Sequence, residues 1–121
     1  GAEDVHIKVK EGDICYLDFG RAYRLECAYQ HLGLVLTILY GKIFVIPMTS
    51  NKTAVEKSLT KRKKHLYYIG QLPGMRKPSC LFLNDAKFLN PARIISKVSH
   101  LSVNSQLFRE LKQYYSQHFL K

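Results

Sequence analysis

The segment Met48-Thr49-Ser50-Asn51-Lys52 places two hydroxyl groups and one ammonium group close together, directly after an apolar run. The point where a strand emerges into a loop is a usual position for functional side chains. Thr49 and Ser50 could donate hydrogen bonds to a phosphate oxygen, and Lys52 could balance growing negative charge there. Thr49 and Ser50 could equally be ordinary turn residues, and the segment by itself favours that alternative.

His31 stands at a loop-to-strand junction, directly before a second apolar run. A histidine ring exchanges its proton near neutral pH and can serve as a general acid or base, although a single histidine is more often a surface or structural residue. Metal-free RNA cleavage needs a base for the 2′-hydroxyl, an acid for the leaving 5′-oxygen and stabilising groups on the phosphate. His31, Thr49, Ser50 and Lys52 together offer these residue types.

Metal-dependent and nucleotide-dependent chemistries find no support in the sequence. The nine acidic residues are scattered, so they form no evident carboxylate cluster for a two-metal nuclease. The chain also has no P-loop, no GxGxxG stretch and no HExxH motif. We therefore expect no metal and no cofactor, and a nuclease built on this chain would have to work without a metal.

The charge balance predicts a polyanionic partner. Nineteen Lys and Arg against nine Asp and Glu give a formal net charge of +10, which favours nucleic acid as the partner. We do not expect a membrane partner, because neither end carries a long basic amphipathic helix. The longest apolar run, Leu32 to Leu39, is also too short to span a bilayer.

A second group of residues could contact an RNA backbone. The run Lys61-Arg62-Lys63-Lys64 is followed by His65, Tyr67 and Tyr68, so it could track a single strand while the tyrosines stack on bases. The run could equally be a solvated loop. Further cationic candidates for RNA binding are Arg21, Arg24, Arg76, Lys77 and Lys87.

Cysteine usage and length predict one domain in a reducing compartment. The three cysteines, Cys15, Cys27 and Cys80, show no CxxC spacing, so we interpret them as small buried hydrophobic residues rather than disulfide, zinc or catalytic thiols. Nothing near the N-terminus resembles a signal peptide, and a cytoplasmic location follows. Gly1-Ala2 has the appearance of a cloning scar, which leaves residues 3–121 as a single domain.

The apolar pattern predicts five or six short strands and one helix. We expect the run at 32–39 to be buried on both faces, a tight turn at 40–42, a mobile loop at 51–64, and a C-terminal helix capped by Ser102 or Asn104. The expected strands cover residues 14–19, 32–39, 43–48, 66–69 and 79–83, with 87–89 as an extension. This order suggests a small curled barrel with the helix packed on it.

Taken in order, these segments resemble the PemK/MazF family of toxin endoribonucleases and the related ToxN type. Val9 to Phe19 is similar to the family's first strand, in which a Gly-Asp pair opens an apolar run ending in Asp. The stretches that continue the resemblance, over roughly residues 9–120, are His31 to Leu36, Pro47 to Ser50, Ser79 to Lys87 and Ser96 to Ser102.

The resemblance implies a mainly β, SH3-like antiparallel barrel with a C-terminal helix, MazF/CcdB-like and homodimeric. It implies metal-independent cleavage of single-stranded RNA (mRNA) to a 2′,3′-cyclic phosphate and a 5′-hydroxyl, and a cognate antitoxin of protein or RNA. Thr49 falls on the family's catalytic Thr or Ser, and Thr49 to Lys52 matches the Thr-Ser-x-Lys pattern of ToxN-like toxins. His31 stands where MazF-like members carry a catalytic Arg, because Glu26 to Leu32 replaces the family's Glu-Gln-Gly-Gly-x-Arg-Pro stretch.

Two other functions fit the same fold. A non-catalytic nucleic-acid-binding SH3-like barrel would bind RNA or DNA with a steep salt dependence and no cleavage. A gyrase poison would act through its C-terminal residues on a topoisomerase and ignore RNA. Cleavage and pull-down assays separate the three.

Overall fold

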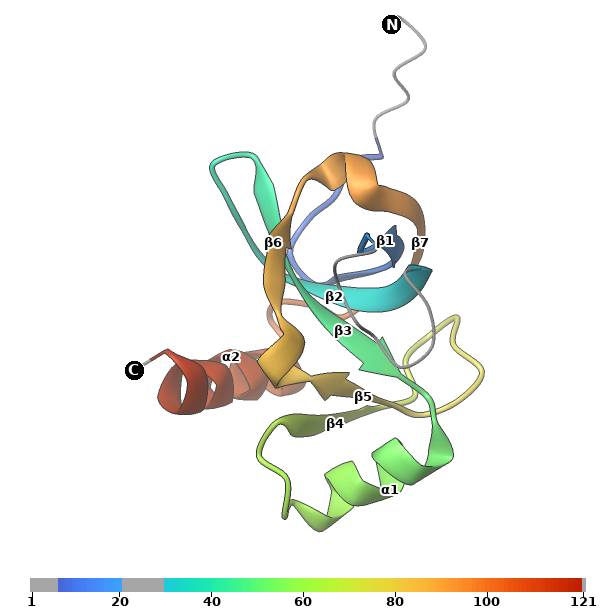
Figure 1. The fold of residues 1–121 in the computed structure, drawn as a ribbon, viewed down its shortest axis with the longest axis vertical. Coiled ribbons are helices and arrows are strands. Elements are labelled where there is room, and N and C mark those ends of the chain that lie inside the picture. The colour runs from blue at the N-terminus through green and yellow to red at the C-terminus, as the bar shows by residue number, and fades with distance from the viewer. Residues whose placement is uncertain (1–6, 21–29, 121) are drawn as a thin grey trace, which may run out of the picture.

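The computed structural model describes residues 7–20 and 30–120, and this part of the chain forms seven strands and two α-helices (Figure 1). The fold is the predicted mainly antiparallel β structure with a C-terminal helix. The elements are β1 (Asp13–Asp18), β2 (Gln30–Leu39), β3 (Lys42–Thr49), α1 (Lys52–Thr60), β4 (Leu66–Gly70), β5 (Ser79–Phe82), β6 (Lys87–Leu89), β7 (Ile94–His100) and α2 (Gln106–Phe119), with single 3₁₀ turns at Leu83–Asp85 and Pro91–Arg93.

The strands form one curled sheet in the order β4-β5-β3-β2-β1-β7, and β6 also pairs with β3. Every pairing is antiparallel. Alternate residues of β3 enter two different apolar clusters: Ile46 and Met48 pack with Phe108 of α2, whereas Val45 packs with Leu17 of β1. Because successive side chains of a strand point to opposite faces, burial on both faces explains why β3 has an almost continuous apolar sequence.

The β2–β3 hairpin confirms the predicted tight turn. Leu39 pairs with Lys42, and the two residues between them have positive φ values of 51° for Tyr40 and 75° for Gly41, as a two-residue hairpin turn requires. Burial on both faces holds only for part of β2. Residues 33–36 are buried, but Leu39 is 49% exposed because the hairpin tip extends beyond both clusters.

The prediction of a loop at 51–64 was wrong for most of that stretch, which forms α1. The side chain of Asn51 caps the helix by accepting a hydrogen bond from the Ala54 N–H at 3.1 Å. Lys61 ends it with a left-handed φ of 58°. The buried face consists of Ala54 and Ser58, four residues apart. Two small side chains make no visible hydrophobic stripe, so periodicity could not predict this helix.

The predicted number of strands was too low because β7 was missed. β7 pairs with β1 at the edge of the sheet, and five of its seven residues are exposed. An edge strand with one buried apolar position, Ile94, lacks the alternation that identifies a strand. Two boundaries also differ: α2 is capped by Ser105, which accepts from the Phe108 N–H, rather than by Ser102 or Asn104, and Leu83 belongs to a 3₁₀ turn.

Candidate functional site

The sheet brings His31 and Thr49 to the same end of neighbouring strands. At this end the last pair of the β2–β3 ladder is Gly33 with Pro47, and His31 and Thr49 each lie two residues beyond that pair. On the outer sides, His31 pairs with Leu17 of β1 and Thr49 pairs with Cys80 of β5. The predicted imidazole and the predicted hydroxyl are therefore at the same end of β2 and β3. We call this part of the sheet the β2–β3 end.

Gly33 allows β2 to pack closely at this end. A Cβ atom added to Gly33 would lie 2.5 Å from Cγ1 of Val45 and 3.1 Å from a methyl group of Leu17. No real side chain tolerates the first distance, so the close packing beside His31 depends on glycine at position 33.

The hydrogen bond of His31 indicates which ring nitrogen is basic. His31 is half-buried, and its Nδ1 lies 3.1 Å from the carbonyl oxygen of Leu32. A carbonyl oxygen can only accept, so Nδ1 donates and carries the proton of the neutral ring. The lone pair of that ring then resides on Nε2, which is the atom able to take a proton from a substrate.

Thr49, Ser50 and Lys52 follow one another where β3 passes into α1. Thr49 is 8% exposed, and its Oγ1 accepts the N–H of Asn51 at 3.0 Å, so its hydroxyl proton remains able to donate. Ser50 and Lys52 are exposed, and Lys52 is the first residue of α1. The first turn of this helix carries no acidic residue, which suits an anion at its positive end.

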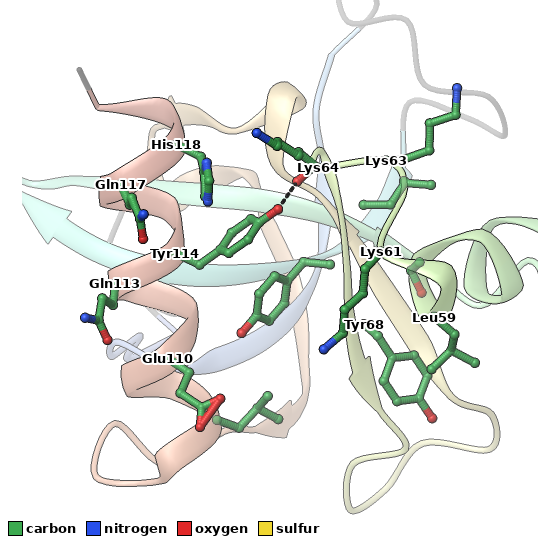
Figure 2. Close-up of a pocket in the computed structure, with 14 residues that line it drawn as sticks. Leu59, Lys61, Lys63, Lys64, Tyr68, Glu110, Gln113, Tyr114, Gln117 and His118 are labelled. Atoms are coloured by element: carbon green, nitrogen blue, oxygen red, sulfur yellow. Dashed lines mark hydrogen bonds between the residues drawn. The ribbon is translucent and has the colours of Figure 1, made fainter.

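A large hollow lies at the other end of α1. It has a volume of about 890 Å³ and is bounded by the end of α1, by β4 and by α2 (Figure 2). Tyr114 of α2 donates its hydroxyl proton to the carbonyl oxygen of Lys64 at 2.9 Å and packs its ring 4.4 Å from His118. Lining residues that matter here are Lys61, Lys63, Lys64, Tyr68, Tyr114 and His118. We call this hollow the α1–α2 groove.

A second, smaller hollow of about 430 Å³ runs beside α1. It is lined by Asn51 at the start of the helix, Lys57 within it, and Lys63 and His65 beyond it. Lys63 and Leu66 line both hollows, so the two adjoin. We call the smaller hollow the α1 channel. The three lysines of the predicted basic run and His65 thus lie along one continuous surface, whereas Arg62 lines neither hollow.

Of the other predicted RNA-binding residues, Lys87 lines neither hollow. Arg21 and Arg24 lie outside the described residues. Lys87 is in β6 and pairs with Val45, toward the start of β3 and away from Thr49. Sequence reasoning assigned no role to Lys57, Tyr114 or His118, although the i, i+4 spacing of Tyr114 and His118 could have suggested that they share one face of the last helix.

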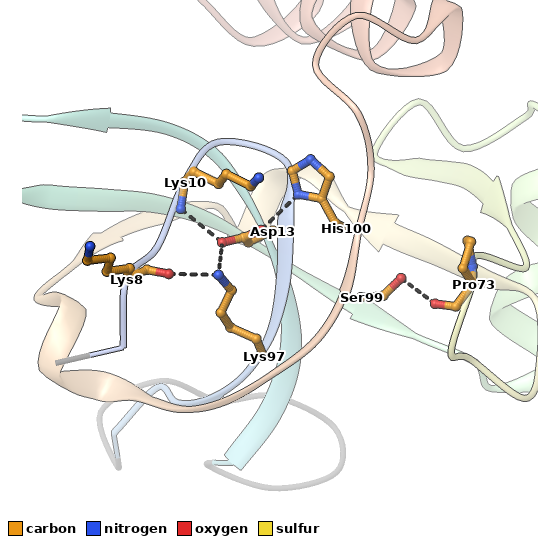
Figure 3. Close-up of polar contacts among 7 residues, drawn as sticks. All are labelled: Lys8, Lys10, Asp13, Pro73, Lys97, Ser99 and His100. Atoms are coloured by element: carbon orange, nitrogen blue, oxygen red, sulfur yellow. Dashed lines mark hydrogen bonds and ion pairs between the residues drawn. The ribbon is translucent and has the colours of Figure 1, made fainter. Parts of the chain in front are cut away.

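A buried carboxylate forms the strongest polar cluster in the described residues (Figure 3). Asp13 is 1% exposed and accepts from the Lys10 N–H at 2.9 Å, from His100 Nδ1 at 2.8 Å and from Lys97 Nζ at 3.2 Å. Burial alone would raise the pKa of Asp13, but these hydrogen bonds and the charge of Lys97 outweigh it and hold the pKa below 3.8. The cluster joins β1 to the edge strand β7.

The described cysteines confirm the interpretation as buried hydrophobic residues. Cys15 and Cys80 are both fully buried and unpaired. Burial raises the pKa of the Cys15 thiol to about 11 and also raises the pKa of Cys80, so both remain protonated and unreactive at neutral pH. Cys27 lies outside the described residues.

Two further features of residues 7–20 and 30–120 bear on chemistry and location. No three His, Cys, Asp or Glu side chains in these ranges gather closely enough to hold a metal ion. None of the helices described is long and apolar enough to cross a membrane.

No protein-family model matches the chain, and no curated protein matches it significantly. Solved structures do match over nearly its whole length. The *Mycobacterium tuberculosis* toxin MazF-mt6 superposes with a TM-score of 0.60 at 12% identity, covering 88% of this chain and 95% of that one. MazF from *Deinococcus radiodurans* superposes with a TM-score of 0.62 at 15% identity, covering 93% and 97%. The chain therefore has the fold of the MazF toxins.

Proposed function

We propose that this protein is a metal-independent endoribonuclease toxin of a toxin–antitoxin system. It cuts single-stranded RNA and leaves a 2′,3′-cyclic phosphate and a 5′-hydroxyl. The fold shared with two MazF structures, one of them described as a toxin, supports this class. The net charge of +10 supports a polyanionic substrate.

The observation that carries the proposal is that His31 and Thr49 lie at the same end of β2 and β3, each two residues beyond the Gly33–Pro47 pair. In the proposed step, Nε2 of His31 takes the proton of the ribose 2′-hydroxyl. The 2′-oxygen then forms a bond to phosphorus while the bond from phosphorus to the 5′-oxygen breaks, and the leaving oxygen takes a proton from solvent. His31 is the general base because its Nδ1 is already committed to the Leu32 carbonyl.

The remaining groups at the β2–β3 end stabilise the negative charge that develops on the phosphate oxygens. Thr49 and Ser50 donate their hydroxyl protons, and Lys52 supplies a full positive charge at the first turn of α1. The positive end of the helix dipole adds to the charge of Lys52. Preorganised donors of this kind act without reorganisation at the moment of reaction, which is why they suit a metal-free site.

The proposal includes the partners and setting that accompany this class. The active form is a homodimer in the cytoplasm, and a cognate antitoxin of protein or RNA neutralises it. The RNA sequence that is cut follows from base contacts outside the catalytic groups and is best read from the cleavage products.

The test is cleavage of a mixed-sequence RNA in the presence of EDTA, with the product ends identified. We expect cutting to persist and Thr49→Val to lower its rate about 10²–10³-fold, the usual loss for one donor to a developing oxyanion. Thr37→Val is the matched control, since Thr37 is on the same hairpin and donates to Glu11 instead. The mechanism would be wrong if EDTA abolished cleavage. It would also be wrong if Thr49→Val and Thr37→Val cleaved RNA at the same rate.

A non-catalytic RNA-binding barrel is the second candidate, and the basic α1–α2 groove favours it. Three lysines and three tyrosines line that groove independently of the β2–β3 end. Under this alternative the protein binds RNA with a strong salt dependence and releases it uncut. The cleavage assay decides between the two candidates directly.

A further inference from the structure

The two hollows beside α1 form one path that starts next to the β2–β3 end. The α1 channel begins at Asn51, the residue between Ser50 and Lys52, and continues to Lys63. The α1–α2 groove begins at Lys63 and continues past Tyr68 to α2. From Lys52 to Thr60 the helix rises about 12 Å at about 1.5 Å per residue. The far groove is therefore about one helix length from the candidate catalytic groups.

We propose that this path binds the flank of a single-stranded RNA, away from the bond that is cut. The inference rests on the proposed function in one respect, namely that RNA is the substrate. The channel guides the sugar–phosphate backbone along α1, and the groove holds the next nucleotides. The path is thus a second binding site, distinct from the β2–β3 end, that adds affinity without taking part in the chemistry.

The charge of the path suits a phosphate backbone. Four lysines line it, namely Lys57, Lys61, Lys63 and Lys64, and His65 and His118 add two imidazoles. Among the described residues that line it, Glu110 is the one acidic side chain. The lysines are exposed, so a phosphate can approach them without a large desolvation cost.

The aromatic side chains of the groove suit unpaired bases. Tyr68 on β4 and Tyr114 on α2 both line the groove, Tyr114 on the side of α2 and Tyr68 beside Leu59 on the side of α1, as Figure 2 shows. Tyr114 is held in place by its hydrogen bond to Lys64 and by ring contacts with Tyr67 at 5.1 Å and with His118. A basic rim with fixed aromatic rings is how proteins bind single strands without reading their sequence. A duplex hides the faces of its bases, so the groove favours a single strand.

The test measures binding rather than cleavage. Fluorescent 2′-O-methyl oligonucleotides of about 4 and about 16 nucleotides, the usual range of such sites, lack the attacking hydroxyl and stay intact. The key variant combines Lys61→Asn, Lys63→Ala and Lys64→Ala. Asn is used at position 61 because the φ of 58° there suits it better than Ala. Lys42→Ala, which removes one exposed charge at the hairpin tip, is the control.

We expect the triple variant to bind the long oligonucleotide with a salt slope smaller by about 2, since each lost phosphate contact lowers the slope by about 0.7. The control should keep the wild-type slope. Tyr68→Leu should weaken binding at least about fivefold, whereas Tyr68→Phe, which keeps the ring, should bind far more tightly than Tyr68→Leu. Wild-type slope and affinity in the triple variant would overturn the inference, and so would an equal loss in Lys42→Ala.

Failure of this inference and failure of the nuclease proposal give different results. A protein that binds the long oligonucleotide through the path but never cuts RNA keeps the second binding site and loses the nuclease. A protein that cuts RNA while the triple variant binds like wild type keeps the nuclease and loses the path. If the groove instead holds an acidic protein, the triple variant again binds RNA like wild type, which counts against the inference.

Discussion

Two histidines lie beside β1, one near each end, and their surroundings differ. His100 pairs with Asp13 at the start of the strand, and its Nδ1 lies 2.8 Å from that buried carboxylate. His31 pairs with Leu17 near the other end, and its Nδ1 donates to a backbone carbonyl. A carboxylate holds the first ring in place as part of the fold. The second ring has an apolar neighbour on one side and a hydroxyl-bearing strand on the other.

The difference shows how the same residue type serves two purposes. At the Asp13 cluster one buried negative charge is matched by the ammonium group of Lys97, the imidazole of His100 and a backbone N–H, which is the condition under which a buried charge is tolerated. The groups proposed for catalysis at the β2–β3 end are a histidine, two hydroxyl side chains and a lysine. Hydrogen-bond donors and a cation of this kind complement a phosphate.

The largest expected effect is on cleavage by His31→Ala. Loss of the general base should lower the cleavage rate about 10²–10⁴-fold, while the free energy of unfolding should change by no more than about 0.5 kcal/mol. His100→Ala should do the reverse, lowering the free energy of unfolding by about 1 kcal/mol with the cleavage rate retained. Single-turnover cleavage and urea unfolding measure the two quantities. Equal rates in both variants would break the contrast between the histidines.

The next effect concerns the two carboxylates of β1, Asp13 and Asp18, and their ion pairs. Asp13→Asn removes the charge on which Lys97 and His100 converge, and we expect the free energy of unfolding to fall by about 2–3 kcal/mol. Asp18→Asn is the control, because its pair with Arg93 spans 3.8 Å between exposed side chains and such pairs are worth about 0–1 kcal/mol. A loss for Asp18→Asn as large as that for Asp13→Asn would contradict the assignment of the Asp13 cluster to stability.

The smallest effect is the acid dependence of stability. The folded protein holds the pKa of Asp13 below 3.8, so the stabilisation is fully present above that value and is lost as the pH falls through the folded pKa. The difference in unfolding free energy between wild type and Asp13→Asn should therefore shrink below pH 3.8. Burial raises the pKa of Asp85, which acts in the opposite direction, but this contribution cancels in the difference. A difference that stays constant down to acid pH would show that Asp13 acts through packing alone.

Much of the sheet could be predicted from the sequence because its strands carry strong local signals. The sequence shows β1, β2 and β3 as apolar runs bounded by turn residues, and Tyr40-Gly41 indicates the hairpin between β2 and β3. α1 and β7 could not be predicted in this way. The buried face of α1 is Ala54 and Ser58, and β7 is an edge strand with exposed residues, so tertiary contacts rather than local periodicity define both elements.

For the candidate site, too, the sequence indicated the residue types, and the tertiary structure determined their positions. Residue types suggested His31, Thr49, Ser50 and Lys52, because the chemistry of phosphate needs a proton acceptor, hydrogen-bond donors and a cation. The resemblance to the PemK/MazF and ToxN toxins then favoured these residues over the alternative of ordinary turn residues. The placement of His31 and Thr49 at one end of the sheet comes from the β2–β3 register, which depends on cross-strand packing around Gly33 and cannot be deduced from composition. The path along α1 depends still more on the fold. The path requires α2, which begins more than 40 residues after the end of α1, to lie beside β4. The position where a helix docks is decided by long-range packing of apolar faces.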